Sequence, residues 1–146
     1  MVAVTLAIVV PLGAATAARA AAAYRPAAEP VAAEGGAVRI PVAELQVGRL
    51  YKYAYAGPRA EVRLLVMRRS QRDVAVALDA CNICPPLGYH QEGDQLICDN
   101  CAAPINPATI GLPGGCNPKP IDGGVEEGAV VIGEDALRSS QAAFTG

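Results

Sequence analysis

The chain of 146 residues has no tryptophan, one phenylalanine and a single histidine, His90. One histidine allows no two-histidine metal site and no H-E-x-x-H helix, and the sequence presents no Ser-His-Asp arrangement for nucleophilic catalysis. A glycine-rich phosphate loop is also missing, which excludes an ordinary nucleotide-binding domain. The net charge of −2 argues against nucleic-acid binding. We therefore expect a protein that is not an enzyme and does not bind nucleic acid.

Charged side chains are absent from residues 2–18, and the first ionisable side chain is Arg19. This run has about the length shared by signal-peptide cores and short membrane-spanning helices. We predict an apolar helix at residues 1–20 that acts as a signal peptide or a membrane anchor, and export from the cytoplasm; whether the segment is cleaved stays open. Residues 21–37 are rich in Ala, Pro and Gly and predict a flexible linker.

Residues 38–146 have the patterning of one small β domain. Short apolar and β-branched runs, separated by turn residues, predict strands at 38–42, 49–56, 62–69, 74–78 and 129–132. Acidic residues at 134–135 and Arg138 later predict a short closing helix at 134–144. The predicted fold class is therefore mainly β.

Three tyrosines, Tyr51, Tyr53 and Tyr55, alternate with other residues along the second predicted strand. A period of two places them on one face of that strand. This face could stack on a ligand, but we favour cross-strand packing, which is the usual role of such a stripe.

The five cysteines lie in a stretch without positive charge. Residues 39–72 hold eight Lys or Arg and two Glu, whereas residues 73–116 hold five Asp or Glu and no Lys or Arg. The basic part is typical of solvated strand faces. Thiolates bound to a cation need no basic residue beside them, because the metal supplies the positive charge.

The cysteine spacing is C-x2-C, thirteen residues, C-x2-C, fourteen residues and C, at Cys81, Cys84, Cys98, Cys101 and Cys116. Residues 85–97 can form a hairpin that folds the second C-x2-C onto the first. Four thiolates then converge in the tetrahedral geometry of zinc ribbons, mononuclear iron sites and cysteine-ligated iron–sulfur clusters. We predict a rubredoxin-like or zinc-ribbon-like site whose metal ligands are Cys81, Cys84, Cys98 and Cys101, with Cys116 as a further cofactor-binding candidate.

Other roles for these residues are less well supported. Disulfides suit an exported protein, but two C-x2-C pairs and an odd fifth cysteine fit a disulfide framework poorly. A thioredoxin-type pair lacks its βαβ context, and no C-x-x-C-H motif is present for haem c. His90 is a candidate ligand, although a hydrogen-bonded strand histidine is the interpretation we favour. Asp79 and Asp99 flank the C-x2-C pairs and are candidates for tuning them, with solvated turn carboxylates as the default.

The stretch 77–121 resembles the FtrD-like family of membrane iron–sulfur proteins. The matching motifs are D-A-C-x-I-C (79–84), G-Y-x-Q-x-G-D (88–94), C-x-N-C (98–101) and I-G-x-x-G-G-C-N-P (110–118). The resemblance implies an extracytoplasmic, membrane-associated protein with a cysteine-bound iron–sulfur centre. It also implies electron transfer that supports bacterial iron uptake, with membrane-embedded iron-transport or redox proteins as partners.

Two function classes follow from these observations. The first is the electron-transfer protein with an iron–sulfur cluster, or another redox metal such as mononuclear iron. Acidic surroundings are expected to lower its reduction potential by disfavouring the more negative reduced state. The second is a binding module in which structural zinc stabilises a small β domain that contacts a membrane transport partner. Spacing alone does not distinguish zinc from an iron–sulfur cluster.

Overall fold

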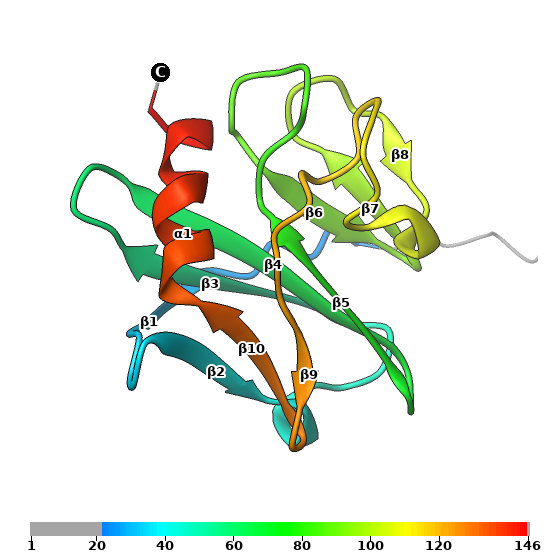
Figure 1. The fold of residues 1–146 in the computed structure, drawn as a ribbon. Helices are drawn as coiled ribbons and strands as arrows, with labels where there is room; N and C mark the ends of the chain where they lie inside the picture. Colours follow the sequence, from blue (N-terminus) through cyan, green and yellow to red (C-terminus); the bar gives the residue numbers. More distant parts are fainter. Residues whose placement is uncertain (1–21, 146) are drawn as a thin grey trace, which may run out of the picture.

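The computed structural model describes residues 22–145, so the apolar segment predicted at residues 1–20 lies outside the described residues. Within residues 22–145 the chain forms ten β-strands, one α-helix and three short 3-10 helices, arranged in three small sheets (Figure 1). The mainly β fold predicted from the sequence is confirmed. None of the helices in this range has the length and apolar character needed to cross a membrane.

The largest sheet has the strand order β1-β3-β4-β5. Its strands are β1 (Ala28–Val31), β3 (Leu50–Ala56), β4 (Glu61–Ser70) and β5 (Asp73–Leu78). β4 runs antiparallel to both β3 and β5, as successive strands joined by tight turns do. β1 adds to the free edge of β3 in the parallel direction.

A second sheet and the α-helix cover one face of this central sheet (Figure 1). The second sheet has the order β2-β10-β9, with β2 (Ala37–Pro41), β9 (Gly124–Glu126) and β10 (Ala129–Gly133). Helix α1 (Glu134–Ser140) follows β10 directly and buries Leu137. The first hydrophobic core lies between these layers and includes Tyr53 and Tyr55. The tyrosine stripe is therefore part of the core, which confirms the packing interpretation.

The opposite face of the central sheet carries a third sheet with the order β6-β7-β8. Its strands are β6 (Tyr89–Glu92), β7 (Gln95–Cys98) and β8 (Pro104–Ile105). β6 and β7 form the hairpin expected between the two C-x2-C pairs, with its turn at Gly93 and Asp94. Short 3-10 helices complete the chain at Val42–Glu44, Pro107–Thr109 and Gln141–Ala143.

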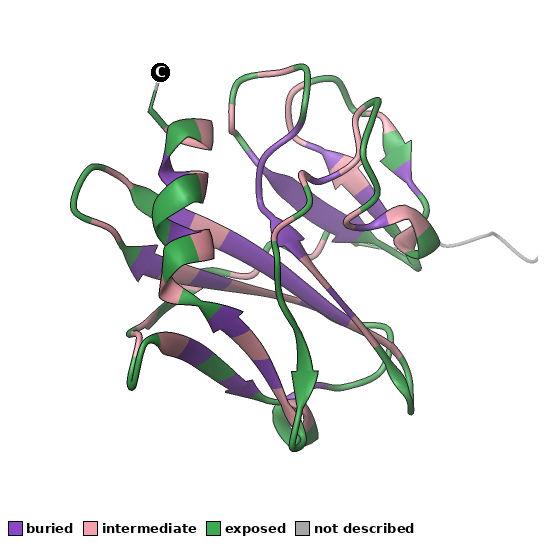
Figure 2. Cartoon of the chain, viewed as in Figure 1, coloured by how far each residue is buried: buried purple, intermediate pink, exposed green. Residues whose placement is uncertain are grey.

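Strand β4 is buried on both sides because it lies between the two cores (Figure 2). Successive side chains of a strand point to opposite faces. Leu64 accordingly lies in the first core and Leu65 in the second, and neither is exposed to solvent. A strand covered on both faces needs a continuous apolar run rather than strict alternation, which explains the sequence Leu64-Leu65-Val66-Met67.

The segment 21–37 differs from the flexible linker expected from its composition. Its described part contains β1, whose four residues pair with β3. Tyr24 also exchanges two backbone hydrogen bonds with Gln91 of β6, at 2.7 and 2.9 Å. Backbone pairing with two sheets outweighs the Ala, Pro and Gly content, so the segment is part of the domain.

The two-sided burial of β4 predicts that neighbouring leucines are equally important for stability. Leu64→Ala and Leu65→Ala are each expected to lower the free energy of unfolding by about 2–5 kcal/mol, because each removes apolar volume from a closed core. Urea denaturation followed by circular dichroism measures both changes. A loss at only one of the two positions would show that one face of β4 is open to solvent and would contradict this description.

Candidate metal centre

Three loops at one end of the molecule bring the five cysteines together. Cys81 and Cys84 lie in the loop after β5, Cys98 ends β7, Cys101 lies in the turn that follows, and Cys116 lies in the loop before β9. Cys81 and Cys98 are buried, Cys84 and Cys116 are half-buried, and Cys101 is exposed. The centre therefore extends from the second core to the surface.

The sulfur atoms form two groups of three that share Cys84. One group contains Cys81, Cys84 and Cys116, and the other contains Cys84, Cys98 and Cys101; within each group all sulfurs lie within 4.8 Å of one another. The sulfurs of Cys101 and Cys116 are 3.5 Å apart and connect the groups. Sequence reasoning expected the four cysteines of the two C-x2-C pairs to form one set. The structure brings all five cysteines together: Cys116 lies beside the first pair, and Cys84 belongs to both groups.

The two C-x2-C turns have matching hydrogen bonds. The thiol of Cys81 accepts from the backbone N–H groups of Ile83, at 3.3 Å, and Cys84. Cys98 accepts in the same way from Asn100 and Cys101. Backbone donors aimed at a sulfur favour its thiolate form, which is the form that binds metals. At Cys98, however, burial outweighs these donors and raises the pKa of the thiol.

The loop carrying Cys116 is fixed from two sides. The hydroxyl of the buried Tyr89 donates to the Cys116 carbonyl at 2.7 Å, and the Asn82 amide donates to the Asn117 carbonyl at 3.2 Å. Gly114 and Gly115 have φ angles of +99° and +57°, which a residue with a side chain adopts only with strain. The Gly-Gly pair thus makes the turn that directs Cys116 toward the other cysteines.

A buried ion pair attaches the first cysteine loop to the central sheet. The Asp79 carboxylate, 2% exposed, lies 2.8 Å from the Lys52 ammonium of β3 and accepts a hydrogen bond from the Tyr89 backbone N–H at 2.9 Å. Burial raises the pKa of the Asp79 carboxyl, and the Lys52 charge opposes this effect. A Cβ atom at Gly88 would lie 2.6 Å from the carboxylate, so only glycine fits there. Asp79 is thus a buried anchor and not the solvated carboxylate expected by default.

His90 lies between two carboxylates. Its Nδ1 is 2.6 Å from Asp99 and its Nε2 is 3.0 Å from Glu92, while Arg25 pairs with Asp99 at 2.6 Å. Both ring nitrogens are therefore engaged, and His90 belongs to neither sulfur group. This arrangement agrees with a hydrogen-bonded strand histidine. The partners of Asp99 lower the pKa of its carboxyl despite partial burial.

The five thiols cannot all ionise together, because thiolates in contact repel each other. Burial opposes ionisation of Cys81, but its backbone hydrogen bonds outweigh this effect and lower its pKa. The Ala103 N–H and the Cys116 thiol lower the pKa of Cys101. In turn, burial and Cys81 raise the pKa of Cys84 to about 11, and Cys101 and burial raise that of Cys116 to about 12. A cation that replaces the retained protons would release them on binding.

The basic residues of β4 support the structure rather than forming a free positive surface. Arg63 donates to the Pro86 carbonyl in the first cysteine loop. Arg68 donates to the carbonyls of Val42 and Leu45, and Arg69 pairs with Asp73 at 2.8 Å. The three arginines of β4 therefore bind neighbouring segments of the chain.

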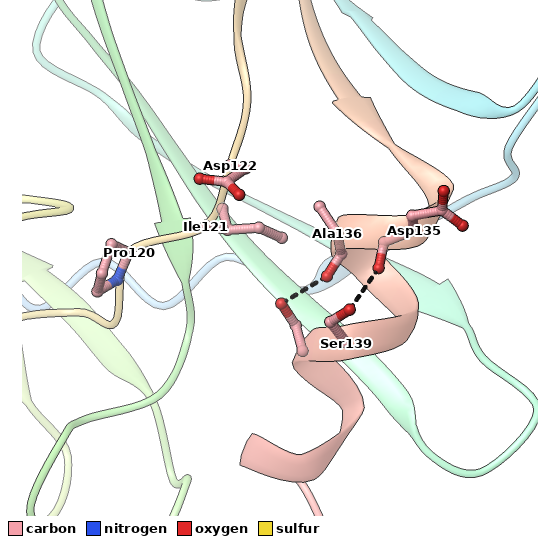
Figure 3. A pocket seen from close by; sticks show the side chains of 7 residues that line it. Pro120, Ile121, Asp122, Asp135, Ala136 and Ser139 are labelled. Carbon is pink, nitrogen blue, oxygen red and sulfur yellow. Dashed lines mark hydrogen bonds between the residues drawn. The ribbon is translucent and has the colours of Figure 1, made fainter.

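A surface pocket lies away from the cysteines, between α1 and the segment before β9 (Figure 3). The hydroxyls of Ser139 and Ser140 donate to the helix carbonyls of Asp135 and Ala136, both at 2.8 Å. Asp122 and Asp135 also line the pocket, but no histidine or cysteine does. The pocket is therefore separate from the cysteine cluster.

The fold and the cysteine cluster define a small β protein with a sulfur-rich candidate metal centre mounted on one face of its central sheet. A family model described as membrane iron-sulfur containing protein FtrD-like matches residues 32–144. The chain therefore belongs to the FtrD-like family. No curated protein and no solved structure matches it.

The side chains present fit the iron–sulfur centre that the family name implies. Every protein donor in the two groups is a cysteine sulfur, and cysteine thiolates are the ligands of iron–sulfur clusters. The same donors also suit zinc. When bound, an iron–sulfur centre supplies one-electron redox chemistry.

Sequence reasoning found the cysteines, Asp79 and Asp99 but missed their partners. Lys52 alternates with the tyrosines of β3 and so lies on the opposite face, toward the cysteine loops. A single lysine on the face of a strand that is otherwise buried indicates a buried carboxylate as its partner, which here is Asp79. Arg25 gave no such signal, because its segment was expected to be flexible.

The ion pair between Lys52 and Asp79 predicts a large effect of removing the cation. Lys52→Met keeps the apolar stem and is expected to lower the free energy of unfolding by about 3–5 kcal/mol, since a buried carboxylate loses its partner. Urea denaturation followed by circular dichroism measures this change.

Two further variants control that experiment. Lys52→Met combined with Asp79→Asn is expected to recover part of the loss, because the amide is neutral and still accepts from Tyr89 N–H. Arg72→Met removes an exposed cation and is expected to change stability by less than about 0.5 kcal/mol. If Lys52→Met behaved like Arg72→Met, the ion pair would not be the anchor described here.

Proposed function

We propose that this protein is an extracytoplasmic, membrane-associated electron carrier whose cysteines hold an iron–sulfur centre that supports iron uptake. The observation that carries the proposal is the convergence of five cysteine sulfurs from three loops in a chain of the FtrD-like family. A cluster of soft donors without a neighbouring histidine ligand or catalytic pair suits a redox centre better than a hydrolytic one. The protein itself is accordingly proposed to be a carrier and not an enzyme.

The gradation of burial across the centre supports electron exchange. Cys81 and Cys98 lie in the second core, whereas Cys101 is exposed at the surface. A centre with one edge at the surface can pass electrons to a docked partner without opening the fold.

Exposed apolar side chains in the cysteine loops support a protein partner. Ile83 and Leu87 in the first loop are 72% and 59% exposed, and Leu112 before Cys116 is 51% exposed. Large apolar residues depart from the usual surface composition when several occur in adjoining loops. We propose that a membrane-embedded redox or iron-transport protein contacts the centre here.

The charges around the centre have a smaller effect on its potential than the sequence suggested. Asp79 is paired with Lys52, and Asp99 is paired with Arg25 and His90. Each pair offsets a negative charge that would otherwise disfavour the reduced state. Backbone N–H groups that donate to sulfur act in the opposite direction and raise the potential.

A structural zinc site is the second candidate function. The third sheet is small, and four of its cysteine neighbours belong to or pack against the second core: Cys81, Cys84, Cys98 and Cys116. A metal would stabilise such a lobe outright. In that case the protein is a binding module that contacts a membrane transport partner.

Metal and sulfide analysis of the full-length chain, purified anaerobically, separates these two functions. The electron-carrier proposal predicts iron and acid-labile sulfide in similar amounts, and a visible absorption band that bleaches on reduction with dithionite. A colourless protein with one zinc per chain would refute electron transfer and favour the zinc module. Oxidised cysteine pairs without any metal would refute both.

Two variants make the test specific to the cluster. Cys84→Ser is expected to abolish the absorption band, because Cys84 belongs to both sulfur groups. His90→Gln is the matched control and is expected to retain iron and sulfide, because its ring nitrogens bond to carboxylates and not to the centre. If His90→Gln lost the absorption band while Cys84→Ser retained it, the assignment of the ligands would be overturned.

A further inference from the structure

We propose that Tyr89 is a positioning residue of the centre, whose hydroxyl acts through Cys81 and Cys116 and raises the reduction potential. The inference rests on the proposed function in one respect, namely that the cysteines hold an iron–sulfur centre. It adds the role of a side chain that is not itself a ligand, and the direction in which that side chain shifts the potential.

Tyr89 lies where the three segments that carry the cysteines meet. It is the first residue of β6 and pairs directly with Cys98 of β7, so the two side chains lie on the same face of the hairpin. Both side chains are buried in the second core. The Tyr89 hydroxyl donates to the Cys116 carbonyl at 2.7 Å and is also hydrogen-bonded to the Cys81 thiol. One side chain therefore connects the two cysteine loops to the hairpin.

The backbone of Tyr89 is fixed independently of its hydroxyl. Its N–H donates to the Asp79 carboxylate at 2.9 Å. Strand β6 is also paired with β7 and bridged to Tyr24 through Gln91. Tyr89→Phe removes one oxygen and keeps the ring, so the effect of the hydroxyl on the centre can be measured separately from the fold.

The single hydrogen of the hydroxyl lies near two acceptors, the Cys116 carbonyl and the Cys81 sulfur. A Cys81 thiol can donate its own hydrogen to the Tyr89 oxygen, but a metal-bound thiolate has no hydrogen and can only accept. With the centre loaded, the Tyr89 hydroxyl is therefore a donor shared between the carbonyl and the sulfur.

A hydrogen bond to a ligating sulfur favours the reduced state, because reduction adds negative charge to the centre. Burial strengthens the effect, since water does not compete for the acceptor and Tyr89 is not exposed. The other donors to Cys81 are the backbone N–H groups of Ile83 and Cys84, which no side-chain substitution removes. Tyr89 thus supplies the contribution to the potential that one oxygen atom controls.

A redox titration of the full-length chain, purified anaerobically and followed by its visible absorption, tests this inference. Tyr89→Phe is expected to lower the midpoint potential, with about a tenfold change in the ratio of oxidised to reduced centre, or about 59 mV for one electron. Tyr55→Phe is the matched control, because it removes a hydroxyl that donates to Glu134 at 2.7 Å on the first-core side of the sheet. The potential of Tyr55→Phe is expected to be unchanged.

Replacing Tyr89 with 3-fluorotyrosine tests the hydrogen bond without removing it. The fluorinated ring keeps the hydroxyl and makes it a stronger donor, so the midpoint potential is expected to rise. Opposite shifts in the two variants distinguish a hydrogen bond to the sulfur from loss of packing, which does not depend on donor strength. This variant also decides the question if Tyr89→Phe does not assemble the centre.

Alkylation of the reduced, metal-free full-length chain tests the contact with Cys116 in the absence of a centre. Iodoacetamide is expected to modify Cys116 faster in Tyr89→Phe than in the unmodified protein or in Tyr55→Phe, because the Cys116 loop loses its bond to β6. Equal rates in all three proteins would overturn the positioning of Cys116 by Tyr89.

The outcomes separate this inference from the proposed function. If the unmodified protein contains iron and sulfide, and both Tyr89 variants share its midpoint potential, the role of Tyr89 is overturned and the carrier function stands. An unmodified protein without iron and sulfide would overturn the carrier function and, with it, any effect of Tyr89 on a potential.

Discussion

The ion pair between Lys52 and Asp79 is the interaction on which the position of the metal centre depends. It joins the middle of the central sheet to the residue that lies two positions before Cys81. The same carboxylate binds the backbone of Tyr89, whose hydroxyl in turn binds the Cys116 carbonyl. One buried charge pair therefore connects β3, the β6–β7 hairpin and the loops that carry three of the cysteines. Such a pair contributes little net stability compared with apolar packing, but it penalises any other arrangement of the loops.

The central sheet separates two tasks on its two faces. The first face packs against β2, β10 and α1 and forms an apolar core that contains no cysteine. The second face carries the cysteine lobe, whose core includes Cys81 and Cys98. The cysteine loops contain little helix or strand. The central sheet beneath them is stabilised independently by the first core. This division also places the sulfurs over a packed sheet, and limited rearrangement around the centre would suit the electron carrier proposed above.

The sequence predicted the parts of this fold that depend on local pattern. The strands of the central meander, β10, the closing helix and the hairpin between the C-x2-C pairs follow from periodicity and turn residues. β1 was missed because its pairing with β3 is a tertiary effect, and Ala28–Val31 has no strong strand signal of its own. The cysteines were all identified from their spacing. The central position of Cys84, and the partners Lys52 and Arg25, required the three-dimensional arrangement, because spacing along the chain carries no distance between separate loops.

Thiolates from three loops are proposed to hold a redox-active iron–sulfur centre on this sheet. A reduction titration monitored by electron paramagnetic resonance tests it most directly, with the full-length protein as purified without oxygen. An iron–sulfur centre is expected to give a signal that appears or disappears with a one-electron dependence on potential. That signal is expected to be absent from Cys84→Ser. A protein whose thiolates are filled with zinc, and which gives no signal at any potential, would contradict it.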